Sequence, residues 1–199
     1  TIGSLRGAIE AGLNSNGQVF LGGDAEIELT YRLASLQEAD WMAKQSFQQS
    51  EIIDFRSMAV APGTSKRILT QVKAVDDAYP LVGDIVLSSA MSLTQALAGQ
   101  NDIPGAVVAP ALLARLQLNV GDTIQLGTQN FVVMATLLKE PDNFGNFALG
   151  PRTLVRTQDL KASGLLAQGT IFSSKYRLIL PKEVDLNAVK EAYEADWST

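Results

Sequence analysis

The sequence predicts an α+β fold in which a split β-α-β layer carries an inserted β-rich module. Two observations indicate this class. The outer segments show strand and helix periodicities in the order strand, helix, strand, strand, and later strand, helix. The middle segment, 104–152, contains short apolar runs separated by close turns, which is typical of a β-rich module. At 199 residues, the chain can bury one large core or two small ones.

The N-terminal part predicts a helix, a strand and a second helix. Residues 5–13 carry Leu or Ile at every fourth position, a helical stripe, although nearby glycines weaken it. Residues 25–32 alternate as a strand that places Tyr31 on its apolar face. Ser35 and Glu38 match a capping box and start the second helix. The predicted buried face of this helix comprises Leu36, Ala39, Met42, Ala43 and Phe47.

Two strands and a less regular segment come next. Residues 51–61 and 66–75 predict a pair of strands joined by the Pro-Gly-Thr-Ser turn at 62–65. The first of these strands is apolar on both faces, so we expect both faces to be covered. Residues 88–102 predict a surface excursion with a brief helix at 93–98.

The middle module begins with an apolar run and a helix that starts at a proline. Residues 106–109 form the apolar run, and residues 110–117 predict the helix. Strands are predicted at 123–126 and 131–138, and the turn between them contains Gly127.

After the module, short elements complete the chain. Residues 152–156 predict a strand, and residues 157–161 predict a helical turn with Leu160 buried. Residues 171–180 predict a further strand, which Pro181 ends. An amphipathic helix follows, whose apolar stripe is Leu186, Val189, Tyr193 and Trp197.

Composition argues against most enzyme classes and against nucleic-acid binding. The chain has no cysteine and no histidine, so it cannot build a Ser-His-Asp triad, a Cys-His dyad or a Cys-ligated zinc site alone. It carries 16 Lys and Arg against 21 Asp and Glu, with no basic run. No apolar run approaches the ~20 residues that span a bilayer. Because the first residue is Thr1, we expect an excised fragment of a longer protein.

Ser173 and Lys175 could form a nucleophile with a base. Residues two apart on a strand share a face, so a Ser–Lys dyad is geometrically possible. No glycine motif for an oxyanion hole accompanies the pair. We therefore favour a solvated strand face at Ser173, Ser174 and Lys175.

Four aspartates could serve hydrolysis or metal binding. They are Asp24, Asp76, Asp77 and Asp142. They lie in or beside predicted turns, where aspartate usually makes local backbone hydrogen bonds, and no calcium-loop spacing is present. We favour that structural role, and we expect no metal and no cofactor. An enzyme stays open as an alternative, which convergence of these carboxylates in one pocket would support.

The loop 140–152 offers a candidate contact surface. Its segment Gly145–Gly150 lacks the G-x-G-x-x-G spacing of a phosphate-binding loop. The rings of Phe144 and Phe147 either tuck back onto the domain or form an exposed apolar contact for a partner or lipid. We take Phe144 and Phe147 as the partner-binding candidates.

Several short motifs together resemble the extracytoplasmic domain of FtsX/MacB-type ABC transporter permeases, most closely the YbbP-like branch. The resemblance covers nearly the whole chain. The motifs are Leu21-Gly22-Gly23-Asp24, Val72-Lys73-Ala74-Val75 before Tyr79-Pro80-Leu81, the run from Pro110 to Gly127 that contains Val120-Gly121-Asp122, Glu140-Pro141-Asp142, and Gly150-Pro151-Arg152.

The resemblance implies a Porter-like layer with an inserted Sabre-like subdomain. We expect residues 1–90 and 170–199 to form the Porter-like part and residues 91–169 to form the Sabre-like part. The leading helix, within 1–20, would continue a transmembrane helix.

The resemblance also implies a non-catalytic role on the periplasmic side of the bacterial inner membrane. The domain would transmit ATP-driven motion of the membrane helices to a periplasmic substrate or partner. A cytoplasmic ATPase subunit would supply the energy, and the full-length permease would be dimeric. The YbbP-like branch implies lipid-related substrates and a lysophospholipase or esterase partner. The alternative is a free-standing periplasmic module that binds a ligand or protein without ATP.

Overall fold

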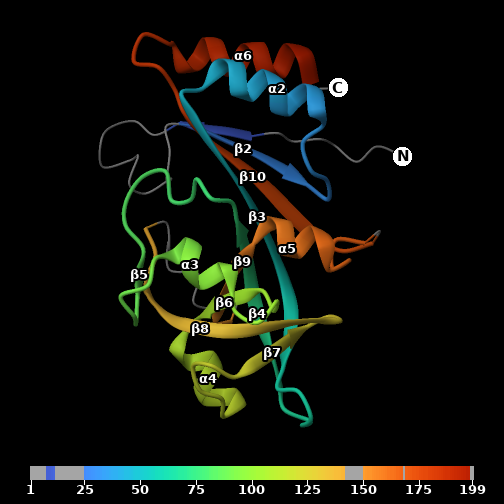
Figure 1. Ribbon diagram of the computed structural model, residues 1–199. Coiled ribbons are helices and arrows are strands. Elements are labelled where there is room, and N and C mark those ends of the chain that lie inside the picture. The colour runs from blue at the N-terminus through green and yellow to red at the C-terminus, as the bar shows by residue number, and fades with distance from the viewer. Residues whose placement is uncertain (1–7, 12–24, 142–149, 168, 198–199) are drawn as a thin grey trace.

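The computed structural model describes residues 8–11, 25–141, 150–167 and 169–197. In this part of the chain, the strands form a ten-stranded mixed sheet, and helices pack against it (Figure 1). The strands are β1 Ala8–Ala11, β2 Ala25–Thr30, β3 Gln48–Val60, β4 Arg67–Val75, β5 Val86–Leu87, β6 Gly105–Val108, β7 Thr123–Leu126, β8 Gln129–Lys139, β9 Arg152–Arg156 and β10 Phe172–Ile179. The helices are α2 Leu36–Gln45, α3 Leu93–Ala98, α4 Pro110–Leu116, α5 Thr157–Ala162 and α6 Leu186–Trp197. Among the described residues, no helix is long and apolar enough to cross a membrane.

One end of the molecule is a layer of two helices on a sheet, which we call the helical layer. Strand β10 lies between β2 and β3 and is antiparallel to both, so β2 and β3 are parallel and α2 connects them. Helices α2 and α6 lie side by side over these strands (Figure 1). Met42, Tyr176 and Tyr193 are buried between helices and sheet. The opposite face of β2 and β10 carries mainly polar side chains.

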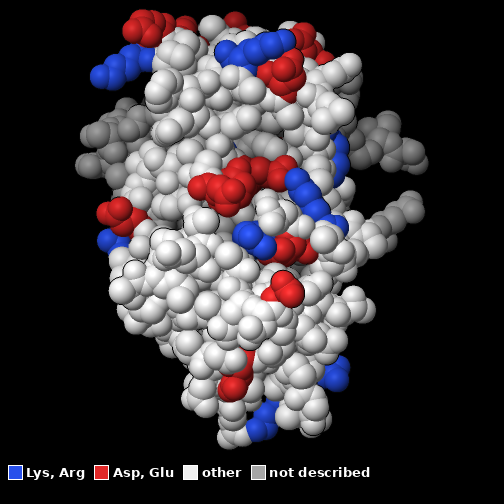
Figure 2. Space-filling view, in the orientation of Figure 1, with Lys and Arg blue, Asp and Glu red and all other residues white. Residues whose placement is uncertain are grey.

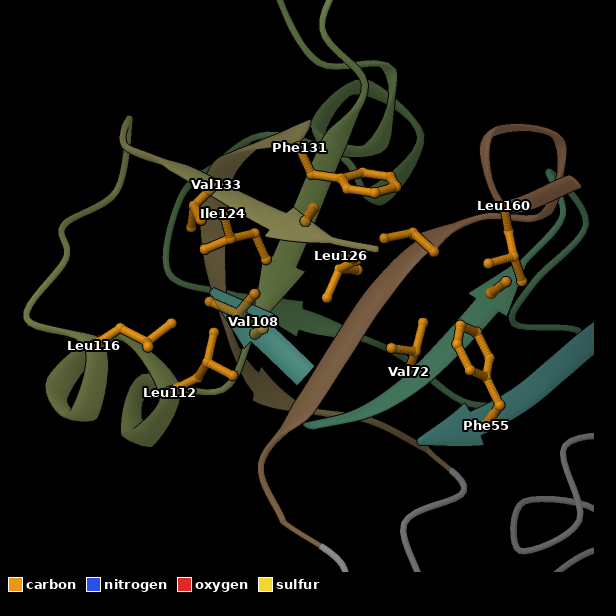
Figure 3. Close-up of a cluster of buried hydrophobic side chains, with 14 of the residues drawn as sticks. Phe55, Val72, Val108, Leu112, Leu116, Ile124, Leu126, Phe131, Val133 and Leu160 are labelled. Atoms are coloured by element: carbon orange, nitrogen blue, oxygen red, sulfur yellow. The ribbon is translucent and has the colours of Figure 1, made fainter. Parts of the chain in front are cut away.

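The other end is a closed barrel. Strand β3 pairs with β4, and the ring continues through β9, β6, β8 and β7 back to β3, where Ala59 and Val60 pair with β7. Closure removes free strand edges around this ring. Aliphatic side chains and phenylalanines fill the interior, and α4 contributes Leu112 and Leu116 (Figure 3).

The two ends share strands and are therefore continuous. The first half of β3 pairs with β10 in the helical layer, and its second half pairs with β7 in the barrel. Strand β4 accompanies β3 along both halves. Helix α3 packs on the outer side of the barrel, where Leu93, Ala96 and Leu97 cover Val107 and Leu154.

Most predicted elements are present close to their expected bounds. Strands β7 and β9 coincide with the predicted ranges 123–126 and 152–156. The capping box of Ser35 and Glu38 is formed at α2. The division at residues 90 and 170 stays a prediction, and β3 and β4, which lie before residue 90, are part of the barrel.

The predicted leading helix is wrong at Ala8–Ala11. These residues form strand β1, which pairs antiparallel with β2. The glycines around this segment disfavour a helix, and β2 offers an open edge for pairing. The rest of the predicted helix lies outside the described residues.

Two burial predictions are also wrong. In the predicted buried face of α2, Met42 is buried as expected, but Leu36 and Ala43 are exposed, as is Phe47 just beyond the helix, and Glu38 is buried. Tyr31 lies beyond the end of β2 with a φ of 62°, so its side chain leaves the strand face and is exposed.

The segment 88–102 is less superficial than predicted. Its helix, α3, is present at the expected residues, but Leu93, Ala96 and Leu97 are buried against the barrel. Gly105 of β6 permits this packing, because a Cβ there would overlap with the carbonyl oxygen of Ala96.

Candidate functional site

The Ser173–Lys175 pair lies on the polar face of β10, but the predicted solvated face is wrong for Ser174, which is fully buried on the opposite face of the strand. The Nζ of Lys175 is 3.4 Å from Oδ2 of Asp54. Burial alone would lower the pKa of Lys175, but the carboxylates of Asp54, Glu26 and Glu28 outweigh burial and raise it. Lys175 therefore stays protonated and cannot accept a proton from a serine hydroxyl.

The described aspartates of the sequence analysis do not form a catalytic cluster. Asp76 accepts hydrogen bonds from Ser50 Oγ and from the backbone N–H of Glu51, both at 2.7 Å, so it holds a turn against β3. Asp77 follows it in the same turn. Asp24 and Asp142 lie outside the described residues. No group of three or more metal-ligating side chains occurs in the part of the chain that the structure describes.

The partner-binding candidates cannot be placed. Phe144, Phe147 and most of the Gly145–Gly150 segment fall within 142–149, which lies outside the described residues. Their assignment stays a prediction from sequence.

A network of charged side chains joins the helical layer to the barrel. We call it the central ionic network, and its members are Lys73, Glu140, Arg152, Asp54 and Lys175. Arg152 donates from Nη2 to Oε1 of Glu140 at 2.9 Å, and its Nη1 lies 3.8 Å from Oδ1 of Asp54. Asp54 in turn faces Lys175 on β10. The chain of contacts thus crosses from β9 through β3 to β10.

The inner end of this network is buried. Lys73 lies 3.8 Å from Glu140 Oε2 and donates to the hydroxyl of Tyr79 at 2.9 Å. The side chains of Lys73 and Glu140 are only 3% and 1% exposed. Such a pair is costly to separate, because each charge would then be buried without its counter-ion.

Two oxygens of the central ionic network make no hydrogen bond. They are Oδ1 of Asp54 and Oε2 of Glu140, each of which faces a cation at 3.8 Å instead. Buried polar atoms usually have a hydrogen-bond partner. At these two oxygens, a nearby cation therefore balances the negative charge, but no hydrogen bond fixes the position of the atom.

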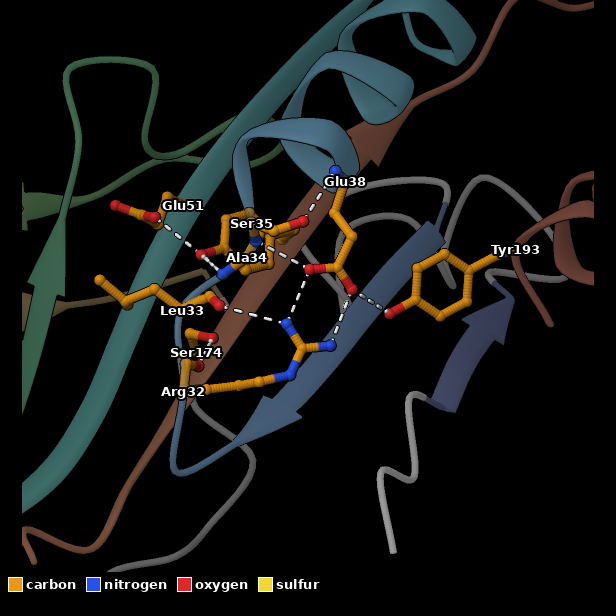
Figure 4. A network of polar contacts seen from close by, with 9 residues as sticks. Arg32, Leu33, Ala34, Ser35, Glu38, Glu51, Ser174 and Tyr193 are labelled. Atoms are coloured by element: carbon orange, nitrogen blue, oxygen red, sulfur yellow. Dashed lines mark hydrogen bonds and ion pairs between the residues drawn. The ribbon is translucent and has the colours of Figure 1, made fainter. Parts of the chain in front are cut away.

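A second network fixes α2 to the rest of the helical layer (Figure 4). Glu38 accepts two hydrogen bonds of 2.7 Å from the guanidinium of Arg32 and one of 2.8 Å from the backbone N–H of Ser35. The hydroxyl of Tyr193, from α6, points at the same carboxylate at 3.4 Å. Ser174 of β10 donates to the carbonyl of Arg32. We call this set the Glu38 network.

The protonation states in the Glu38 network follow from these contacts. Burial would raise the pKa of Glu38, but hydrogen bonds from Arg32 and Ser35 outweigh burial and lower it. Burial, and then the neighbouring carboxylate of Glu38, raise the pKa of Tyr193 to about 12. At neutral pH the carboxylate is therefore charged and the phenol is neutral.

The surface carries both acidic and basic side chains. On the face in Figure 2, acidic and basic side chains adjoin near the middle, and no continuous basic patch crosses the face. The described residues thus offer two structural networks of charge, and neither one combines a nucleophile with a base.

Sequence reasoning missed both networks as functional features. One signal was present: Lys73 is a charged residue between Val72 and Ala74 in the apolar run 72–75 of a predicted strand. A charge in such a run requires a buried partner. The partner, Glu140, lies 67 residues away and could not be assigned without the fold.

Comparison with known proteins gives a sequence relative but no match to a family model. The chain is 28% identical over 179 residues to the ABC transporter permease YbbP of Escherichia coli K12. This alignment covers 88% of the chain and 21% of the relative, so the chain spans about a fifth of the length of the permease it matches.

Three solved structures have a similar fold. The extracellular domain of the ABC-type transporter YknZ from Gram-positive bacteria matches with a TM-score of 0.51 and 10% identity, over 79% of this chain and 77% of that one. The periplasmic region of MacB from Actinobacillus actinomycetemcomitans matches with a TM-score of 0.52 and 12% identity, over 82% of this chain and 72% of that one. A domain of a permease protein from Porphyromonas gingivalis matches with a TM-score of 0.51 and 13% identity, over 76% of this chain and 69% of that one. The predicted resemblance to FtsX/MacB-type extracytoplasmic domains is confirmed.

Proposed function

We propose that this chain acts as the extracytoplasmic domain of an FtsX/MacB-type ABC transporter permease and transmits motion from the membrane to a periplasmic substrate or partner. The similarity to YbbP and to domains of YknZ and MacB supports the class of protein. In this proposal, a separate cytoplasmic ATPase supplies the energy, and the full-length permease is a dimer attached to the inner membrane. The helical layer and the barrel correspond to the Porter-like and Sabre-like parts.

The observation that carries the mechanical proposal is the shared strand pair. Strands β3 and β4 run from the helical layer into the barrel, so displacement of one end displaces the other. The central ionic network braces the same junction between Asp54 and Glu140. Because two of its oxygens make no hydrogen bond, the junction can shift without breaking hydrogen bonds at those atoms.

Distance measurements in the full-length transporter test this proposal. Ala43→Cys on α2 and Arg115→Cys on α4 give attachment points for spin labels, because this chain has no cysteine and any cysteine elsewhere in the transporter is replaced by serine. We expect the distance between these labels to change when the ATPase binds a non-hydrolysable ATP analogue. A control pair within the barrel, Arg115→Cys with Thr128→Cys, should keep its distance. An unchanged first distance in a transporter that still hydrolyses ATP would contradict transmission through the domain.

We also propose that Phe144 and Phe147 contact a periplasmic partner, an esterase of the lysophospholipase type, and that the transported substrate is lipid-related. This proposal rests on the composition of the loop and on the resemblance. Pull-down of the purified esterase on the wild-type domain tests it. Binding that is lost in Phe144→Ala/Phe147→Ala supports the contact, and binding that the double variant retains removes the loop assignment. If the wild-type domain does not bind the esterase, the esterase is not its partner.

A further inference from the structure

The polar face of the sheet contains a groove with no assigned role. Its volume is about 760 Å³, and its floor is formed by β2, β10, β3 and β4. The segment 169–171 forms one wall. This volume is in the range of sites that hold small ligands, roughly 300–1,000 Å³.

The two ends of the groove carry opposite charges. Arg56 lies at one end, beside Gln71 of the neighbouring strand, and Glu28 lies at the other. Among the described residues, the Arg56 side chain makes no hydrogen bond or close ion pair, whereas Glu28 lies opposite Lys175 in the sheet and contributes to the raised pKa of that lysine. In contrast, Asp54 between them is compensated by Lys175 and Arg152.

The groove carries polar side chains along its middle beside the apolar lining residues Phe55, Ile171 and Phe172. Thr30, Ser173 and Asp54 lie in register across the three strands β2, β10 and β3. The hydroxyls of Thr30 and Ser173 can donate or accept hydrogen bonds. They can therefore serve backbone amide groups of a bound molecule as donors or acceptors.

Strand geometry gives the separation of the two charges. From the registers, Arg56 and Glu28 are four residues apart along the strand direction and two strands apart across the sheet. With a rise of about 3.3 Å per residue and a strand spacing of about 4.8 Å, their Cα atoms are roughly 16 Å apart. An extended peptide advances about 3.3–3.6 Å per residue, so about four residues bridge the gap between the side-chain tips.

We propose that this groove binds a short extended peptide, with its C-terminal carboxylate on Arg56 and its N-terminal ammonium on Glu28. The charge at each end, the hydroxyls between them and the span all match such a ligand. The site does not depend on coupling to an ATPase, so it can be tested on the isolated chain and stands or falls separately from the mechanical role.

Titration followed by NMR tests the proposal, with tetra-alanine as the probe. Three forms are compared: free termini, a C-terminal amide, and an N-terminal acetyl group. We expect the free form to shift amide signals of Thr30, Ser173 and Arg56 selectively. Removing either terminal charge should weaken binding about tenfold, the usual scale for a hydrogen bond to a charged group.

Two substitutions assign the ends of the peptide. Arg56→Gln should weaken the free peptide about tenfold and leave affinity for the amidated peptide unchanged. Glu28→Gln should show the same relation with the acetylated peptide. Arg115→Gln and Glu183→Gln, which change exposed charges outside the groove, are the matched controls.

Three results would overturn the proposal. The first is no shift at millimolar tetra-alanine. The second is equal affinity for the three peptide forms, because the terminal charges would then not be recognised. The third is an equal loss in Arg56→Gln for free and amidated peptides, because Arg56 would then act on something other than the carboxylate.

Discussion

The barrel and the helical layer are stabilised by different chemistry. The barrel core consists of aliphatic side chains and phenylalanines, among them Phe131 and Leu126, both fully buried. The core of the helical layer contains Met42, Tyr176 and Tyr193, and the charged Glu38 is buried beside them. In the barrel, the buried side chains are apolar, so the pattern of apolar residues in the sequence predicts which residues are buried. Where a carboxylate is buried, the same pattern fails.

The largest expected effect tests the apolar barrel core. Phe131→Ala removes a large, fully buried side chain, and we expect it to lower the free energy of unfolding by about 3–5 kcal/mol. Urea titration followed by circular dichroism measures this loss. Leu36→Ala, at a side chain that is 91% exposed, is the control and should change stability little. A loss below about 1 kcal/mol for Phe131→Ala would show that the barrel does not depend on this core.

The next effect tests the charged core of the helical layer. Glu38→Gln keeps the shape but leaves Arg32 without its counter-ion, so we expect a loss of about 2–3 kcal/mol at pH 7. The same urea titration measures it. Asp40→Asn is the control, because its pair with Lys44 is exposed and should contribute about 0.5 kcal/mol or less. Equal losses in both variants would mean that burial of Glu38 adds nothing.

The pH dependence of stability sharpens the same contrast. The pKa of Glu38 is lower in the folded chain than its usual value of about 4.3. Its contribution is therefore complete above that value and is lost as the pH falls through the folded pKa. We expect the stability difference between wild type and Glu38→Gln to shrink from about pH 5 to about pH 3. A difference that stays constant over a series of urea titrations would contradict this assignment.

The smallest expected effect concerns the aromatic edge of the helical layer. Trp197 packs on Trp41 and Tyr193, with ring centroids 5.3 Å and 5.5 Å apart. Trp197→Ala should cost about 1 kcal/mol and reduce the near-UV circular dichroism. Asp196→Ala, at the exposed neighbouring position, is the control. An unchanged near-UV spectrum in Trp197→Ala would show that the three rings are not packed in solution.

Much of the barrel could be predicted because its strands and turns are specified locally. The strand 123–126 alternates, and Gly127, with a φ of 58°, marks the turn that follows. The strand order could not be predicted, because β3 joins β7 through the pairs Ala59 with Leu126 and Val60 with Gln125, which are 67 and 65 residues apart in sequence. Pairings of that range depend on the whole topology.

The helical layer shows why the candidate sites were harder to predict. Ser35 and Glu38 were recognised as a capping box, which is a local pattern. The same Glu38 also binds Arg32 and faces Tyr193, which lies 155 residues further along the chain. Those contacts turn the helix so that Glu38 faces inward and Leu36 faces solvent. No helical period of apolar residues could have indicated this orientation.

The length of β3 has a mechanical consequence. Its 13 residues, at about 3.3 Å each, give a lever arm of roughly 40 Å from the helices to the far end of the barrel. If this arm tilted by about 5° at the helical end, the far end would swing by roughly 3–4 Å. A displacement of that size equals about one residue along a strand. A small rotation at the helical end would therefore appear as a displacement of several ångströms at the barrel tip.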